Sequence, residues 1–343
     1  MGSFANFARR RAYRLTGFTT GYNFVLWFCL SGIMLGFCLA RLKYLDFYGV
    51  MCNPDQSKPS TAAIGECFHL LRPLYANGMI LHLAGVVPGG ILAVVQFVPV
   101  VRNKALLIHQ VNGYLVIVLA LVGIAGGFII TRPTMGGQVD TQTATGFLGT
   151  TFLFANLMAY FSIKRLRIDL HRAWMIRAWV WTYTLGFERK LTFIYRVLYQ
   201  AGSILSIRLI FVLTFLILPM TGTYYLSQPC DKLAWLFNDE HKTLAEYAEC
   251  EAWFSKQNLE QRAHVRAEWL NAKNLAERMT AMNISYGVAS WIGLAIHIMA
   301  VEVYLNLTSA EAQRLRKMSI KRRIEAGMQT APTNGELNDV KTE

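Results

Sequence analysis

Two carboxylates stand among basic and aromatic side chains in largely apolar parts of this sequence. Asp140 follows Arg132 in one such stretch, and Glu188 directly precedes Arg189 in another. An ionisable group near hydrocarbon is costly unless it is paired or faces a polar cavity, so residues of this kind indicate a site. A carboxyl group that apolar surroundings keep protonated can serve as a proton donor. Asp140 and Glu188 are therefore the candidates for acid catalysis.

Large aromatic side chains precede Glu188 at a density beyond what packing against lipid requires. They are Trp179, Trp181, Tyr183 and Phe187. Aromatic faces attract cations, so a group of them beside an acid could line a site that handles positive charge. An interfacial aromatic belt is the alternative, because membrane proteins build such belts from the same residue types.

The composition indicates an integral membrane protein. Hydrophobic residues make up 54% of the chain and charged residues only 16%. Mean hydropathy is +0.31, which is unusual for a soluble chain of 343 residues. We predict an all-α, polytopic helical bundle of about eight spans, with seven as the alternative. The expected spans are 22–41, 78–101, 109–130, 145–163, 172–188, 190–206, 207–226 and 283–305.

The distribution of basic residues predicts the orientation. Arg9, Arg10, Arg11 and Arg14 precede the first span, and a second basic cluster around 314–323 follows the last, so both termini are expected in the cytosol. This arrangement requires an even number of spans. It assigns the polar residues to two clusters at opposite ends of the bundle. The luminal cluster consists of His82, Arg132, Asp140, Glu188 and Arg189. The cytosolic cluster consists of Gln96, Arg102, His109, Asp169, His171 and Arg172.

Four cysteines lie in the two long loops that this topology assigns to the lumen, where disulfides persist. Pairs Cys52–Cys67 and Cys230–Cys250 would each close a local loop; four free thiols are the alternative. Residues 1–326 are expected to form one membrane domain with a helical luminal insertion at about 227–282. The polar tail at 327–343 is expected to be disordered in the cytosol.

Structural roles are expected for part of the cytosolic cluster. His109 and His171 can hydrogen-bond to neighbouring helix ends. Arg177 lies further inside its span and requires a partner, such as Glu302 near the cytosolic end of the last span.

The order of polar residues in the middle of the chain resembles a broad group of bacterial and fungal predicted membrane proteins of unknown function. The resemblance covers about residues 78–226. It is carried by His82, Gln96, Arg102, His109, Gly113-Tyr114, Gly126-Gly127 and the run Asp169-x-His171-Arg172-x-Trp174-Met175-Ile176-Arg177. Within that group, the extra first span, the cysteine-bearing loops and the insertion resemble the fungal membrane-bound terpene cyclases of ascofuranone and ascochlorin biosynthesis.

This resemblance implies a cyclase of isomerase type in meroterpenoid secondary metabolism, needing no metal or cofactor, in the endoplasmic reticulum membrane. Its substrate would be an apolar prenylated phenol, a farnesylated aromatic carrying a terminal epoxide, that enters from the bilayer. Asp140 or Glu188 would protonate the epoxide, and His82 and Arg132 would tune or reprotonate the acid. Arg132, Arg189 and the four aromatic residues would bind the substrate and the cation formed from it.

Two other classes remain open. A transmembrane b-type haem oxidoreductase could use pairs among His82, His109, His171 and His297 as axial ligands. A transporter or lipid-binding scaffold could use the same polar groups without chemistry. The composition gives no indication of nucleic-acid binding, and the sequence leaves open the exact substrate, the ring formed and the oligomeric state.

Overall fold

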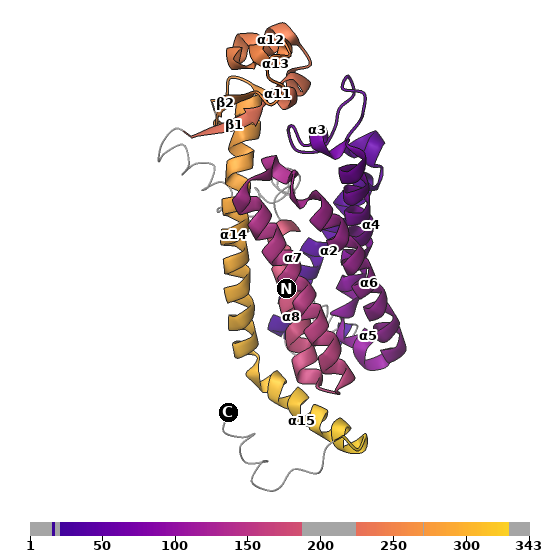
Figure 1. The fold of residues 1–343 in the computed structure, drawn as a ribbon. Coiled ribbons are helices and arrows are strands. Elements are labelled where there is room, and N and C mark those ends of the chain that lie inside the picture. Colours follow the sequence, from indigo (N-terminus) through magenta and orange to yellow (C-terminus); the bar gives the residue numbers. More distant parts are fainter. Residues whose placement is uncertain (1–15, 18–20, 187–223, 270, 329–343) are drawn as a thin grey trace, which may run out of the picture. The chain divides into compact units, whose positions relative to one another are not determined.

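A computed structural model describes residues 16–17, 21–186, 224–269 and 271–328 (Figure 1). Five helices in these ranges are long and apolar enough to cross a membrane. They are α2 (Gly21–Arg41), α4 (Pro73–Gln96), α6 (Leu106–Thr131), α7 (Val139–Lys164) and α14 (Leu275–Leu307). The predicted all-α membrane fold is therefore confirmed.

The predicted span at 172–188 corresponds to α8 (Ile168–Gly186), which carries three charged residues and is not among the five apolar helices. The predicted spans at 190–206 and 207–226 fall wholly or mostly outside the described residues. The choice between seven and eight spans therefore stays a prediction. Short helical segments join the long helices: η1 (Leu42–Leu45), η2 (Phe47–Met51), α3 (Cys67–Leu70), α5 (Pro99–Lys104) and η3 (Thr134–Gly137).

The chain divides into two compact units. The first consists of residues 1–143 and 188–289, and the second of residues 144–187 and 290–343. The first turns of α7 and the first half of α14 thus belong to the first unit.

Close packing of α4 against α6 dominates the first unit and depends on glycine. A Cβ atom added to Gly85 would collide with the backbone of α6 at Gly123, and one added to Gly126 would collide with the backbone of α4 at Gly78 and His82. Small residues at such crossings let helix backbones approach closely, which favours helix pairing in membranes. Helix α4 begins with Pro73 in its first turn, where the missing N–H of proline costs nothing.

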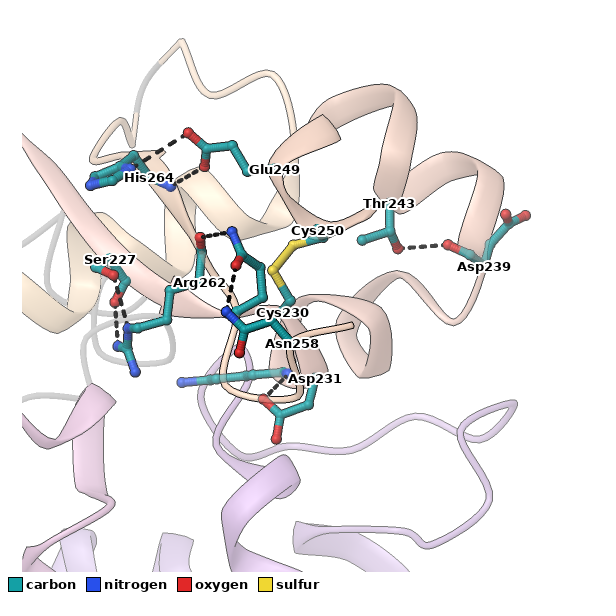
Figure 2. Close-up of a disulfide and its surroundings, with 12 residues drawn as sticks. Ser227, Cys230, Asp231, Asp239, Thr243, Glu249, Cys250, Asn258, Arg262 and His264 are labelled. Atoms are coloured by element: carbon teal, nitrogen blue, oxygen red, sulfur yellow. Dashed lines mark hydrogen bonds and ion pairs between the residues drawn. A yellow bond between two sulfur atoms is a disulfide. The ribbon is translucent and has the colours of Figure 1, made fainter. Parts of the chain in front are cut away.

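The insertion contains a small sheet as well as short helices. Strands β1 (Tyr225–Pro229) and β2 (Arg262–Arg266) pair antiparallel, with Ser227 opposite His264. The short helices are α11 (Cys230–Phe237), α12 (Glu240–Glu246), η4 (Ala248–Cys250) and α13 (Glu251–Phe254). Fully buried side chains such as Leu233, Val265 and Met279 form its core. Both predicted disulfides, Cys52–Cys67 and Cys230–Cys250, are present, and Figure 2 shows the second.

The structure adds two details to the predicted helical insertion. The helical periodicity did not indicate β2, although the burial of Arg262–Arg266 alternates as a half-buried strand requires. The last membrane helix begins at Leu275, two turns before the predicted 283, because Asn274 Oδ1 accepts the N–H of Glu277 and caps a polar first turn. Mean hydropathy along the sequence does not assign such a polar turn to a membrane span.

Aromatic contacts hold the second unit together. Phe152 meets Trp179 edge to face with ring centres 5.7 Å apart, and Phe147 lies 5.6 Å from Trp291 on α14. Helix α15 (Ser309–Glu325) follows α14 after Thr308 and packs on α8 (Figure 1). The predicted disordered tail at 327–343 lies almost entirely outside the described residues.

Candidate functional site

The turn between α6 and α7 positions Asp140. Met135, Gly136 and Gly137 all have positive φ angles, of 47°, 79° and 67°. Such a turn reverses the chain tightly and lets α7 start at Val139. Asp140 therefore lies in the first turn of α7, where its Oδ1 accepts the N–H of Thr141 at 2.8 Å.

The carboxylate of Asp140 packs against Gly287 of α14. A Cβ atom added to Gly287 would overlap all three atoms of that carboxyl group, so only glycine leaves room for it. A carboxylate in direct contact with a helix long and apolar enough to cross a membrane is the kind of group that a functional site contains.

Asn283 lies on the same face of α14, one turn before Gly287. Its side chain is fully buried, and neither Oδ1 nor Nδ2 has a hydrogen-bond partner among the described residues. A Cβ atom on Gly136 would come within 2.5 Å of Nδ2, so the amide packs directly on the turn before α7. An unsatisfied buried amide costs free energy and calls for an explanation, such as a bound polar group.

Glu66 completes this set from the loop before α3. Its side chain is buried, and Oε2 accepts the backbone N–H of Met135 at 3.0 Å. We call Glu66, Gly136, Asp140, Asn283 and Gly287 the Asp140 site. It combines two carboxyl groups, one amide without a hydrogen-bond partner in the described part of the chain, and close backbone packing. A carboxyl group can in principle transfer a proton to an oxygen atom, and the described residues contain no set of metal ligands.

His82 and Arg132 were expected to act on the candidate acid. His82 Nδ1 donates to the carbonyl of Gly123 on α6 at 2.8 Å, which leaves Nε2 as the acceptor in the neutral ring. Arg132 is the C-cap residue directly after α6 and has an exposed side chain. Neither residue forms a hydrogen bond or ion pair with Asp140 in the described part of the chain.

The predicted aromatic residues lie in the second unit or beyond the described ranges. Trp179 and Trp181 are buried on α8, and Trp179 packs on Phe152. Tyr183 belongs to α8 by its backbone. Phe187, Glu188 and Arg189 lie outside the described residues, so the role of Glu188 as the alternative acid stays a prediction.

The predicted partner of Arg177 is confirmed. Arg177 Nε donates to Glu302 Oε1 at 2.6 Å and Nη2 donates to Oε2 at 2.8 Å, a bidentate pair between α8 and α14. His171 Nδ1 donates to the carbonyl of Ala159 on α7 at 2.9 Å, as its predicted structural role requires. His109 contributes its backbone carbonyl, which accepts from Gln96 Nε2 at 2.9 Å.

Other residues of the same run also join helices. Ser319 Oγ on α15 donates to Asp169 Oδ1 at 2.8 Å. Arg172 Nη2 donates to Thr308 Oγ1 at 3.3 Å at the end of α14. The run from Asp169 to Arg177 thus connects α8 to three neighbouring helices, which is an architectural role.

The haem alternative requires two histidines at the same depth within a bundle. In the first unit, His82 contacts α6 at Gly123, whereas His109 lies about 20 Å away along α6 at the rise of an α-helix. These two histidines therefore cannot bind the same iron.

The histidine pair of the second unit is separated in a similar way. Because Arg172 contacts Thr308, the adjacent His171 is level with the end of α14. His297 lies about 16 Å from Thr308 along that helix. The geometry within each unit therefore does not favour a haem bound by two histidines.

Residues 79–226 match the model of a family described as predicted membrane protein (DUF2306). No curated protein and no solved structure matches the chain significantly. The matched range contains most of α4 and all of α6, α7 and α8, and with them His82, Asp140 and the run from Asp169 to Arg177. It agrees with the predicted resemblance over about 78–226, so this part of the chain is similar to a family of predicted membrane proteins.

Proposed function

We propose that this protein is a membrane-bound terpene cyclase that protonates the terminal epoxide of a farnesylated aromatic compound and cyclises its prenyl chain. The single observation that carries the proposal is the contact of the Asp140 carboxyl group with Gly287 on a helix apolar enough to cross a membrane. An apolar prenylated substrate reaches such a group from within the bilayer, and a cyclisation that excludes water needs apolar surroundings.

The reaction is an isomerisation, and its atoms balance without a further reactant. Asp140 donates its proton to the epoxide oxygen as the C–O bond at the more substituted carbon breaks, which leaves a hydroxyl group and a tertiary cation. The double bonds of the prenyl chain attack this cation in turn, and loss of a proton to a base from the last cation ends the sequence. The product has the mass of the substrate.

Asn283 supports this reading because it supplies a polar contact at the same place. Its free amide lies one helical turn from Gly287, about 6 Å between Cβ positions in an ideal helix. An amide offers both a donor and an acceptor, and both suit an oxygen atom that changes from ether to hydroxyl. We further propose an endoplasmic reticulum location with both termini in the cytosol, and the disulfide-bonded loops are consistent with the lumen on the opposite side.

The test is to feed an epoxyfarnesyl phenol to membranes that contain the protein and to look for an isomer of equal mass. Asp140→Asn keeps the size of the side chain and removes the proton source, so turnover should fall by about two orders of magnitude or more. Asp169→Asn is the matched control, because Asp169 is also in the first turn of a helix but bonds to Ser319. Asp169→Asn should retain turnover.

Glu188→Gln belongs in the same experiment because Glu188 is the alternative acid. Loss of product only in Glu188→Gln would transfer the role of acid to that residue. If Asp140→Asn and Glu188→Gln, both at normal abundance, each form product at the wild-type rate, the acid-initiated mechanism at these residues is refuted.

A further inference from the structure

Glu66 belongs to a buried polar group outside the apolar helices. It precedes Cys67, so the Cys52–Cys67 disulfide restrains the backbone beside it. Only 4% of Glu66 is exposed, and its Oε2 accepts the N–H of Met135 across 69 residues of sequence. The disulfide and this hydrogen bond thus restrain Glu66 from two segments that are distant in the sequence.

The turn that Glu66 contacts is conformationally demanding. Met135 has a φ angle of 47°, and Gly136 and Gly137 continue in the same left-handed region. Residues with a side chain rarely adopt this conformation, so neighbouring structure must hold Met135 in it. The hydrogen bond from Met135 to a buried carboxylate is such a restraint, and bonds to charged acceptors are stronger than neutral ones.

Lys232 is a second charged group that interacts electrostatically with Glu66. Lys232 is in the first turn of α11 with 1% of its surface exposed. Burial lowers the pKa of Lys232, and the negative charges of Glu66 and Asp231 oppose that shift. A Cβ atom on Gly65 would come within 3.2 Å of Lys232 Cε and would collide with Met279, so the chain just before Glu66 is packed tightly.

We propose that Glu66 is a positioning residue that holds the Met135–Gly137 turn and, through it, Asp140. Two residues, Gln138 and Val139, separate this turn from Asp140, and Val139 already begins α7. A change of the turn therefore rotates or shifts the first turn of α7 and moves the carboxylate off Gly287. The catalytic part of this inference rests on the proposed function, whereas the structural part does not.

Hydrogen–deuterium exchange on the full chain in lipid nanodiscs tests the structural part without any substrate. In Glu66→Ala, amide exchange across 135–141 should rise by roughly tenfold to a hundredfold, the range expected from losing one hydrogen bond to a charged acceptor. Glu249→Ala is the matched control, because Glu249 Oε2 also accepts a backbone N–H, that of His264, at 2.7 Å on the exposed surface of the insertion (Figure 2). It should leave exchange across 135–141 unchanged.

A second variant distinguishes positioning from general unfolding. Glu66→Gln keeps an oxygen that can accept from Met135 and removes the charge, so it should restore most of the protection that Glu66→Ala loses. Unchanged exchange across 135–141 in Glu66→Ala would overturn the inference. An equal rise across α11 to α13 would overturn it too, because the effect would then be loss of the whole fold.

The catalytic consequence is measured separately. If the chain cyclises the epoxide, Glu66→Ala should lower kcat by roughly tenfold or more with KM little changed, since the acid is misplaced while the pocket remains. A wild-type protein that forms no isomer refutes the proposed function alone, and the exchange experiment still decides the role of Glu66. Normal kcat together with a loosened turn would refute the link to Asp140.

Discussion

Replacing Glu302 by glutamine removes the charge that Arg177 meets on the facing helix through hydrogen bonds of 2.6 and 2.8 Å. The guanidinium group also lies 4.9 Å from the centre of the Trp174 ring, a cation–π distance. Glu302→Gln keeps the shape of the side chain. It therefore isolates the charge as the quantity that is changed.

The magnitude follows from how far each partner is withdrawn from solvent. The side chain of Arg177 is 23% exposed and that of Glu302 is 44% exposed. Pairs on the surface contribute about 0–1 kcal/mol, and stranding one member of a buried pair costs about 3–5 kcal/mol. This pair is intermediate and bidentate, so we expect Glu302→Gln to lower the free energy of unfolding by about 2 kcal/mol.

A double-mutant cycle with Arg177→Met and Glu302→Gln measures the coupling between the two side chains. Unfolding in mixed micelles and abundance in membranes are the readouts, and turnover is recorded separately. Glu311 and Arg314 on α15 provide the control, because they form the same bidentate pair at 2.7 Å with greater exposure of the arginine. The control pair should couple by less than about 0.5 kcal/mol.

Two results would refute this reasoning. Additive effects of Arg177→Met and Glu302→Gln would mean that the pair stabilises nothing. Normal abundance with lost turnover in Arg177→Met would mean that the active site lies at this end of the bundle.

Three further predictions concern other parts of the chain. Burial, and then the charges of Lys232 and Arg72, lower the pKa of His69 to about 4, so stability present above pH 6.5 should be lost as the pH falls towards 4. Partial exposure of His69 limits this loss of unfolding free energy to about 1–2 kcal/mol. Thermal unfolding at pH 7 and at pH 4.5 measures it, and the His69→Gln variant should not show this loss between the two pH values. Gly126→Ala should destabilise the protein by about 1–3 kcal/mol, because the added Cβ atom collides with α4. Gly146→Ala should stabilise the protein by about 0.5–1 kcal/mol, because nothing lies within 4 Å of the added Cβ atom. Equal melting temperatures of the two variants would contradict this prediction. Tags at both termini should be digested by protease outside sealed microsomes, and a protected C-terminal tag beside an accessible N-terminal one would reject the eight-span topology.

Some contacts were predictable because the physical demand on one residue leaves few possible partners. An arginine inside an apolar segment must meet an acid, and Glu302 is the acid at the matching depth of the last span. Cysteines in the two long loops pair locally for a similar reason, since each loop holds two of them. Apolar length alone indicates the five long helices.

Other contacts had no local signal. Glu66 reaches Met135 through a loop without periodicity, and nothing in the spacing of the two residues indicates that they meet. Asn283 lies at a level of α14 that hydropathy treats as the start of the span, so its free amide is apparent only once the helix is extended back to Leu275. Polar contacts between distant segments depend on tertiary packing, and the sequence pattern does not contain it.

The direction of α7 and α14 links the Asp140 site to the insertion. Gly136 meets Asn283 and Asp140 meets Gly287, so residue numbers increase together along the two helices and both start at the same end. Helix α14 starts directly after the disulfide-bonded insertion. Asp140 must therefore lie on the same side of the membrane as that insertion, whichever side this is. If the Cys230–Cys250 disulfide requires the oxidising lumen, the proposed acid is luminal as well, and an epoxide held there has its oxygen near the luminal end of the bilayer core.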